Sequence, residues 1–189
     1  MKKVLILMSC LLMAFSFTAM AGKKEDETAY LLQNKDGSWA YEEIVQIPNI
    51  TKEELFKRGK AWILENMKTG DNNIAFDDKE FTINNNGTMK IDPKTFFSWA
   101  ITEGAFNFKF HVWLKDGKYR FRIDNVVAYL IVNANNMLSP KTVLYSEMQE
   151  DDNKGTRYMK GQINDNLVPF VAAFKRGMAS ATTQAKNDW

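Results

Sequence analysis

The chain has 189 residues, of which 45% are hydrophobic, and this length suits one domain with a hydrophobic core. Without Lys2 and Lys3, the 25 basic residues become 23 and equal the 23 acidic ones, so the formal net charge of +2 comes from the first residues alone. A neutral chain lacks the basic surface that nucleic-acid binding requires, which excludes nucleic acid as the expected partner.

The first 21 residues have the pattern of a secretory signal peptide. Two lysines are followed by an apolar run over residues 4–17, and Ala19-Met20-Ala21 then forms a small-x-small cleavage site. The apolar run is too short to span a bilayer comfortably, so no membrane span is expected. The sequence therefore predicts an exported protein, in the periplasm or at the cell surface and outside the cell, with a mature chain that starts at Gly22.

Cys10 suggests an alternative in which a lipid is attached to its thiol. Only six residues separate Cys10 from Lys3, which is an unusually short apolar stretch for a lipoprotein signal. Cleavage after Ala21 without a lipid is therefore the preferred interpretation. Because the rest of the sequence has no cysteine, the domain must fold without disulfides.

Residues 22–40 are polar and are predicted to form an N-terminal segment ahead of a folded domain at residues 41–189. A run rich in β-branched side chains over residues 41–47 predicts the first strand of that domain. Pro48 follows this run directly and is expected to end the strand.

A capped amphipathic helix is expected next. Thr51 can accept hydrogen bonds from the first free backbone amides, and Glu54 can reach back to it in a capping box. An apolar stripe at helical spacing includes Trp62, which we expect to be buried between this helix and the sheet. Gly70 is expected to end the helix. Further along, Asn86-Gly87 predicts a tight hairpin turn.

The strongest strand pattern consists of two alternating runs on either side of Asp116-Gly117, a two-residue turn that fixes the register. One face of this hairpin is apolar on both strands, and the other carries aromatic and charged side chains. The register pairs Leu114 with Tyr119, Val112 with Phe121 and Phe110 with Ile123 on the apolar face, and Trp113 with Arg120 and Lys109 with Asp124 on the opposite face.

The remaining chain is predicted to contain more strand, a loop and a second helix. The expected segments are a strand at residues 126–132, a loop at 133–141, a short strand at 143–145 and a charged turn at 150–155. Leu167, Val171, Phe174 and Met178 follow helical spacing. Asn166 can cap this helix, which places Pro169 in its first turn.

Two stretches carry a resemblance to a known family: Thr51-Lys52-Glu53-Glu54-Leu55-Phe56 leading to Ala61-Trp62, and Lys115-Asp116-Gly117-Lys118-Tyr119-Arg120. Together with the order of elements, they make residues 41–181 resemble a secreted bacterial family of unknown function with a TBP-like fold. The resemblance implies an α+β fold in which a single antiparallel sheet carries two helices on one face, in the order strand, helix, four strands, helix. It brings no catalytic residue, and the fold-level analogy to DNA binding carries little weight.

The inventory of catalytic and metal-binding side chains is thin. His111 is the only histidine, and without the signal no cysteine is left, which excludes Cys–His catalysis and zinc sites of the Cys/His type. The acidic runs at residues 77–78 and 150–152 lack the alternating spacing of a calcium loop. We therefore predict no catalytic residue, no metal and no cofactor.

Two sets of residues are candidates for binding. The outer sheet face combines aromatic and cationic side chains, which favour contacts with a protein or a glycan. The aromatic interior is either an ordinary core or the lining of a cavity for a lipid-like ligand, and Trp99, expected in a loop, can add to either set. The outer-face set is Trp113, Arg120, Arg122, His111 and Lys109, and the interior set is Trp62, Phe106, Phe108, Phe110, Phe121 and Phe174.

The sequence thus predicts an exported, non-catalytic binding domain whose partner is an envelope protein or a glycan. The alternative, from a different class, is a carrier of a small apolar ligand held in a cavity between the sheet and a helix. An enzyme is the third hypothesis, because few side chains of this sequence suit catalysis.

Overall fold

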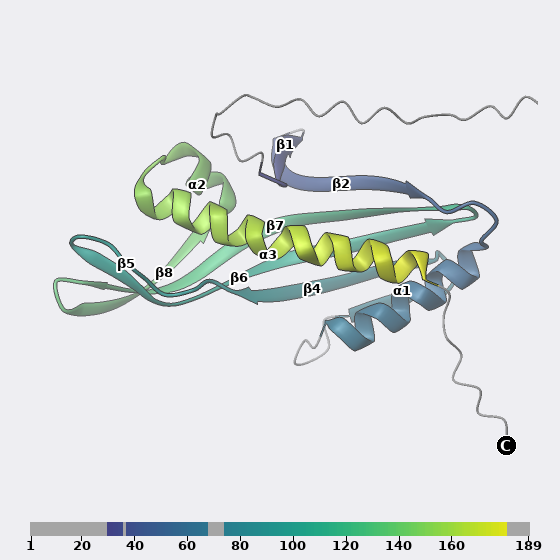
Figure 1. Ribbon diagram of the computed structural model, residues 1–189, viewed down its shortest axis with the longest axis horizontal. Helices are drawn as coiled ribbons and strands as arrows, with labels where there is room; N and C mark the ends of the chain where they lie inside the picture. Colours follow the sequence, from purple (N-terminus) through teal and green to yellow (C-terminus); the bar gives the residue numbers. More distant parts are fainter. Residues whose placement is uncertain (1–29, 36, 68–73, 181–189) are drawn as a thin grey trace, which may run out of the picture.

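The computed structural model describes residues 30–35, 37–67 and 74–180 (Figure 1). The predicted signal peptide at residues 1–21, with its cleavage site and Cys10, lies outside the described residues, as does Gly70. Among the described residues, no helix is both long enough and apolar enough to cross a membrane.

An antiparallel sheet of eight strands makes up most of the described chain (Figure 1). Its neighbouring strands follow the order β1-β2-β7-β6-β4-β3, with β5 paired to β6 and β8 paired to β7. This arrangement confirms the predicted α+β class with a single antiparallel sheet. The strands are β1 (Gln33–Lys35), β2 (Ser38–Gln46), β3 (Ile74–Asp77), β4 (Thr82–Lys90), β5 (Lys94–Thr95), β6 (Trp99–Lys115), β7 (Lys118–Ala134) and β8 (Met137–Leu144).

The β6–β7 hairpin is the central pair of this sheet. Each strand has 17 residues, and at about 3.3 Å per residue such a strand is roughly 55 Å long. The predicted register around Asp116-Gly117 is confirmed on both faces, from Lys115 opposite Lys118 to Lys109 opposite Asp124. Near the turn, β2 and β4 flank the hairpin, whereas β8 and β5 flank its far half, away from α1 (Figure 1).

Three helices accompany the sheet in the described chain: α1 (Lys52–Asn66), α2 (Tyr145–Glu150) and α3 (Lys154–Ala179). The Thr51 side chain caps α1 by accepting a hydrogen bond from the Glu54 amide at 3.3 Å, as predicted. The short α2 lies beside the start of α3 (Figure 1).

Helices α1 and α3 cover the same face of the sheet. A Cβ on Gly59 of α1 would lie 2.9 Å from the side chain of Ile83 in β4. The ring of Phe174 in α3 lies 4.9 Å from that of Phe110 in β6. Because Ile83 and Phe110 are fully buried, the hydrophobic core lies between these helices and the sheet.

The folded domain begins before Tyr41, within the segment that the sequence predicted to precede it. Strand β1 pairs with the start of β2, and residues 38–40 already belong to β2. Leu32 and Ala40 are buried in the structure, with 2% and 1% of their surface exposed. Leu32 lies just before β1 and Ala40 lies in β2, and the polar residues around them hid both buried positions in the sequence.

The prediction of a hairpin turn at Asn86-Gly87 is wrong. Strand β4 runs without interruption from Thr82 to Lys90, and both residues pair with β6. A Cβ on Gly87 would lie 2.2 Å from the ring of Phe108, so this glycine is needed for the close approach of an aromatic side chain. The chain turns earlier, between β3 and β4, where Phe81 has a φ of 51°.

The expected loop at residues 133–141 is also wrong, because β7 continues to Ala134 and β8 starts at Met137. The turn between them consists of Asn135 and Asn136, with φ values of 51° and 61°. Asparagine tolerates this left-handed backbone better than most residues. Strand β8 pairs only with β7 and is mostly exposed, and an edge strand of this kind can hold Pro140.

The last helix begins well before its predicted start. Asn153 caps α3, and its side chain accepts hydrogen bonds from the amides of Gly155 and Thr156. The predicted cap Asn166 and the predicted first-turn residue Pro169 both lie inside the helix. The first turns of α3 are polar, so their pattern in the sequence is weaker than that of the apolar stripe that follows.

The predicted position of Trp62 needs a correction. Its ring is only partly buried and contacts Phe170 and Phe174 of α3, with ring centroids 5.5 Å and 5.1 Å apart. Trp62 therefore packs between the two long helices rather than between α1 and the sheet. Gly177 of α3 makes this contact possible, because a Cβ there would lie 2.2 Å from Trp62 Cδ1.

Two glycines of α3 test this helix contact. We expect Gly177→Ala to lower the free energy of unfolding by about 1–3 kcal/mol, because the rigid indole of Trp62 must move. Gly161 has no atom within 4 Å of an added Cβ, so Gly161→Ala should raise it by about 0.5–1 kcal/mol through helix propensity. Urea unfolding of both variants measures the difference, and equal stabilisation by the two substitutions would contradict the Trp62 contact.

Candidate functional site

The outer face of the sheet carries side chains of β6 and β7 that alternate with the core residues. Arg120 lies over the Trp113 ring, with its Cζ atom 4.2 Å from the ring centroid, which confirms the predicted cation–π contact. His111, two residues before Trp113 on β6, also stacks on the Trp113 ring, with ring centroids 5.7 Å apart. Cross-strand pairing on a rigid hairpin thus holds these three side chains in one orientation.

Arg122 is the centre of a second cluster on this face. Its guanidinium donates to Asp124 at 2.7 Å, to Ser38 at 2.9 Å and to Glu42 at 3.4 Å. The hydrogen bond to Asp124, the nearby carboxylate charges and the bond to Glu42 raise the pKa of Arg122 above its usual value, against a smaller opposing effect of burial. Arg122 therefore stays charged and is compensated within the chain.

His111 and Lys109 complete the predicted outer-face set. His111 Nδ1 lies 2.6 Å from the Asn84 side-chain oxygen, and its Nε2 lies 3.7 Å from Asp124. Lys109 is opposite Asp124 in the register, but Asp124 pairs with Arg122 instead. The predicted cross-strand pairing of Lys109 with Asp124 is thus confirmed in the register, but the carboxylate of Asp124 forms its ion pair with Arg122, two residues away on the same strand.

A cationic hollow lies where this face meets the β6–β7 turn. It has a volume of about 400 Å³ and is lined by Ile44, Trp113, Lys115, Lys118, Tyr119 and Arg120. Ile44 is 59% exposed. Among the described residues, the three cations of this lining form no salt bridge. Asp116 in the adjacent turn accepts a hydrogen bond from the Lys52 amide at the start of α1.

The aromatic interior forms the hydrophobic core. Phe106, Phe108, Phe110, Phe121 and Phe174 are at most 2% exposed. Phe174 lies 4.9 Å from Phe110 and 5.5 Å from Phe121, measured between ring centroids. These are distances of direct edge-to-face contact. The rings therefore occupy the space between α3 and the sheet in which the alternative hypothesis placed an apolar ligand.

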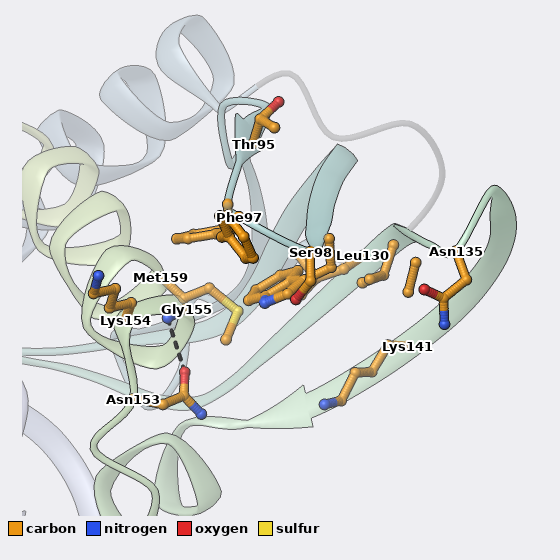
Figure 2. A pocket seen from close by; sticks show the side chains of 14 residues that line it. Thr95, Phe97, Ser98, Leu130, Asn135, Lys141, Asn153, Lys154, Gly155 and Met159 are labelled. Atoms are coloured by element: carbon orange, nitrogen blue, oxygen red, sulfur yellow. Dashed lines mark hydrogen bonds between the residues drawn. The ribbon is translucent and has the colours of Figure 1, made fainter.

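A groove at the far end of the hairpin was not predicted from the sequence. It has a volume of about 960 Å³ and lies between the β5–β6 turn, the ends of β7 and β8, and the first turns of α3 (Figure 2). Trp99, expected in a loop, is the first residue of β6 and lines this groove. Phe96 stacks on it at 4.2 Å between ring centroids. The aromatic run at residues 96–99 was the only sequence signal.

A polar cluster lies on the helix side of β2. Glu43 forms hydrogen bonds with Tyr41 and Lys175, which tie α3 to β2. Burial and the charge of Glu43 raise the pKa of Tyr119, so this buried phenol stays neutral. The described chain contains no group of three or more metal-ligating side chains. The hydrogen bonds of Glu43 therefore act as a structural tie between β2 and α3.

The fold and these surfaces define a class of small α+β domain built on one long hairpin. Residues 41–129 match DUF4468, a domain of unknown function with a TBP-like fold. This match places that stretch of the chain in the DUF4468 family and confirms the resemblance that the sequence indicated. No curated protein is significantly similar to the chain.

Two crystal structures share the fold. A TBP-like protein from Parabacteroides distasonis has a TM-score of 0.63 and 13% identity, over 80% of this chain and 99% of the other. A DUF4468 family protein from Bacteroides ovatus has a TM-score of 0.62 and 18% identity, over 85% of this chain and 99% of the other. At these identities the likeness establishes the TBP-like fold.

The Glu43 cluster makes stability depend on pH. Burial by itself would raise the pKa of Glu43, but hydrogen bonds from Lys175 and Tyr41 and the Lys175 charge lower it below its ordinary 4.5. A lowered pKa stabilises the fold above the ordinary value, and this contribution is lost as the pH falls through the folded-state pKa.

We expect Glu43→Gln to reduce the free energy of unfolding at pH 7 by about 1 kcal/mol or less, because the ion pair is partly exposed. The difference from the unsubstituted protein should shrink as the pH falls below 4.5. Glu103→Gln, an exposed carboxylate on β6, is the matched control and should show a much smaller difference. A Glu43→Gln effect that is constant with pH would contradict the tie.

Proposed function

We propose that this protein is an exported, non-catalytic binding module that docks an acidic segment of a partner protein on its outer sheet face. Export rests on the signal-like pattern of residues 1–21. Docking rests on the hollow at the β6–β7 turn, where Trp113 and Arg120 stack and lysines flank them.

The uncompensated positive charge of this hollow is the observation that carries the proposal. Arg122, further along the same face, is paired with Asp124 and Glu42, whereas Lys115, Lys118 and Arg120 have no salt-bridge partner among the described residues. With its plane held on the indole, the guanidinium of Arg120 has N–H groups available for a carboxylate. Unpaired cations beside an aromatic anchor complement an acidic segment.

A protein partner fits this surface better than a glycan. Exposed Ile44, opposite Arg120 in the register, lines the hollow together with Trp113, and an aliphatic side chain gives an apolar residue of a peptide a complementary contact. Tryptophan and arginine anchors at the centre of a patch are typical of protein interfaces. A carrier function in the aromatic interior has less support, because Phe174 and Phe110 are in direct contact there.

The test uses synthetic acidic peptides with one central aromatic residue, and matched peptides with amide side chains in place of the acids. We expect Trp113→Ala with Arg120→Ala to weaken acidic-peptide binding by about 2 kcal/mol or more, roughly thirtyfold. The fold should survive, because both side chains lie on the face opposite the core. Calorimetric titration measures the affinity, and thermal unfolding checks the fold.

Val168→Ala with Arg176→Ala on the exposed side of α3 is the control pair and should leave the affinity unchanged. Equal binding of acidic and amide peptides would refute the electrostatic complementarity. Unchanged affinity in the Trp113 and Arg120 variant would refute the site. If the protein binds a uronic-acid oligosaccharide but none of the acidic peptides, the partner is a glycan and the proposal of a protein partner is refuted.

A further inference from the structure

The groove at the far end of the β6–β7 hairpin has an apolar floor. Leu130, Val132 and Ala134, at alternate positions of β7, are in its lining. Met159 of α3 closes one side (Figure 2). Trp99 packs closely on the start of α3, since a Cβ on Gly155 would lie only 2.5 Å from its ring. Ligand sites typically have volumes of roughly 300–1,000 Å³ and mostly apolar linings, and this groove of about 960 Å³ agrees with both properties.

The charged groups of the groove all have one sign. Lys141 and Lys154 are in its lining, and none of the fourteen lining residues is acidic. Lys141 stands opposite Leu130 in the β7–β8 register, which places its side chain on the same face as the apolar floor. Neither lysine forms a salt bridge with another described residue. The groove is therefore apolar along its floor and cationic at its sides.

The start of α3 does not supply this positive character through its backbone. The amides of Gly155 and Thr156 already donate to the Asn153 side chain, at 2.8 Å and 3.0 Å. Of the acids before the helix, Asp151 accepts from the Asn153 amide group and Asp152 pairs with Arg157, and neither lines the groove. The cationic groups that line the groove are therefore lysine side chains: Lys141 points toward Asn153, whereas Lys154 lies on the outer side of the start of α3 (Figure 2).

We propose that this groove is a binding site for a long-chain carboxylate, with the acyl chain on the β7 floor and the carboxylate at Lys141, while Lys154 adds positive charge at the α3 edge of the groove. The site is separate from the cationic hollow at the β6–β7 turn, which lies at the opposite end of the hairpin. It also differs from the aromatic interior, whose rings are in contact with one another. The groove combines an apolar floor with positive charges only. This combination complements an amphipathic anion and discriminates against a neutral chain.

The experiment titrates dodecanoate into the purified protein by calorimetry, below the concentration at which it forms micelles, and compares dodecanol, which has the same chain without the charge. Saturable binding of one dodecanoate per chain is expected, with weaker binding of dodecanol. Lys141→Glu with Lys154→Glu should weaken dodecanoate roughly tenfold, because attraction becomes repulsion at both positions, with little effect on dodecanol. Ala134→Trp should weaken both ligands by filling the floor.

Lys57→Glu with Lys79→Glu, at exposed positions outside both the groove and the hollow, makes the same charge change and should leave both affinities unaltered. Thermal unfolding confirms that each variant is folded. The proposal is overturned if dodecanoate does not saturate, if the groove charge reversal has no effect, or if the control charge reversal weakens binding equally. A further outcome would overturn it: the protein binds vesicles of anionic phospholipid but not free dodecanoate, and Phe97→Ser abolishes the vesicle binding. The fully exposed Phe97 would then insert into a membrane.

Discussion

The register of the β6–β7 hairpin is the constraint on which both faces of the sheet depend. Side chains alternate between faces with a period of two, so a slip of one residue would expose Phe110 and bury Arg122. The turn that fixes this register also positions α1, because the Gly117 amide donates to Ile50 and the Lys52 amide donates to Asp116. One two-residue turn thus places the core face, the outer face and the first helix relative to one another.

Helix α3 is held to this hairpin by an aromatic contact and a polar one. Phe174 contacts rings of both central strands, and its neighbour Lys175 reaches Glu43 on β2. Glu43 also accepts a hydrogen bond from the Tyr41 hydroxyl. Its charged carboxylate is therefore fully hydrogen-bonded at a place where burial alone would disfavour the charge. These two contacts fix the position of the C-terminal half of α3 over the part of the sheet that is near the β6–β7 turn.

The sequence predicted the hairpin, α1 and the alternation of the two faces, because those features depend on neighbours that are close along the chain. It failed where distant residues decide the structure. Asn86-Gly87 has the composition of a turn, but Gly87 is a strand residue that makes room for Phe108. The outer-face residues could be predicted from the register, whereas the far groove joins residue 99 to residue 155 across more than fifty positions, and no local pattern indicates such a contact.

A chain whose charges nearly cancel can still present two cationic surfaces, because its acidic side chains are paired at some positions and absent from others. Asp124 and Glu42 neutralise Arg122 in the middle of the outer face, and Asp116 is used at the start of α1. At the turn, Lys115 and Lys118 line the hollow together with Trp113. At the far end, Lys141 and Lys154 line the groove together with Trp99. The screening length of about 8 Å at physiological salt is far shorter than a hairpin of roughly 55 Å. The two ends are therefore electrostatically independent, so the two proposed sites can be tested separately by charge reversal at one end.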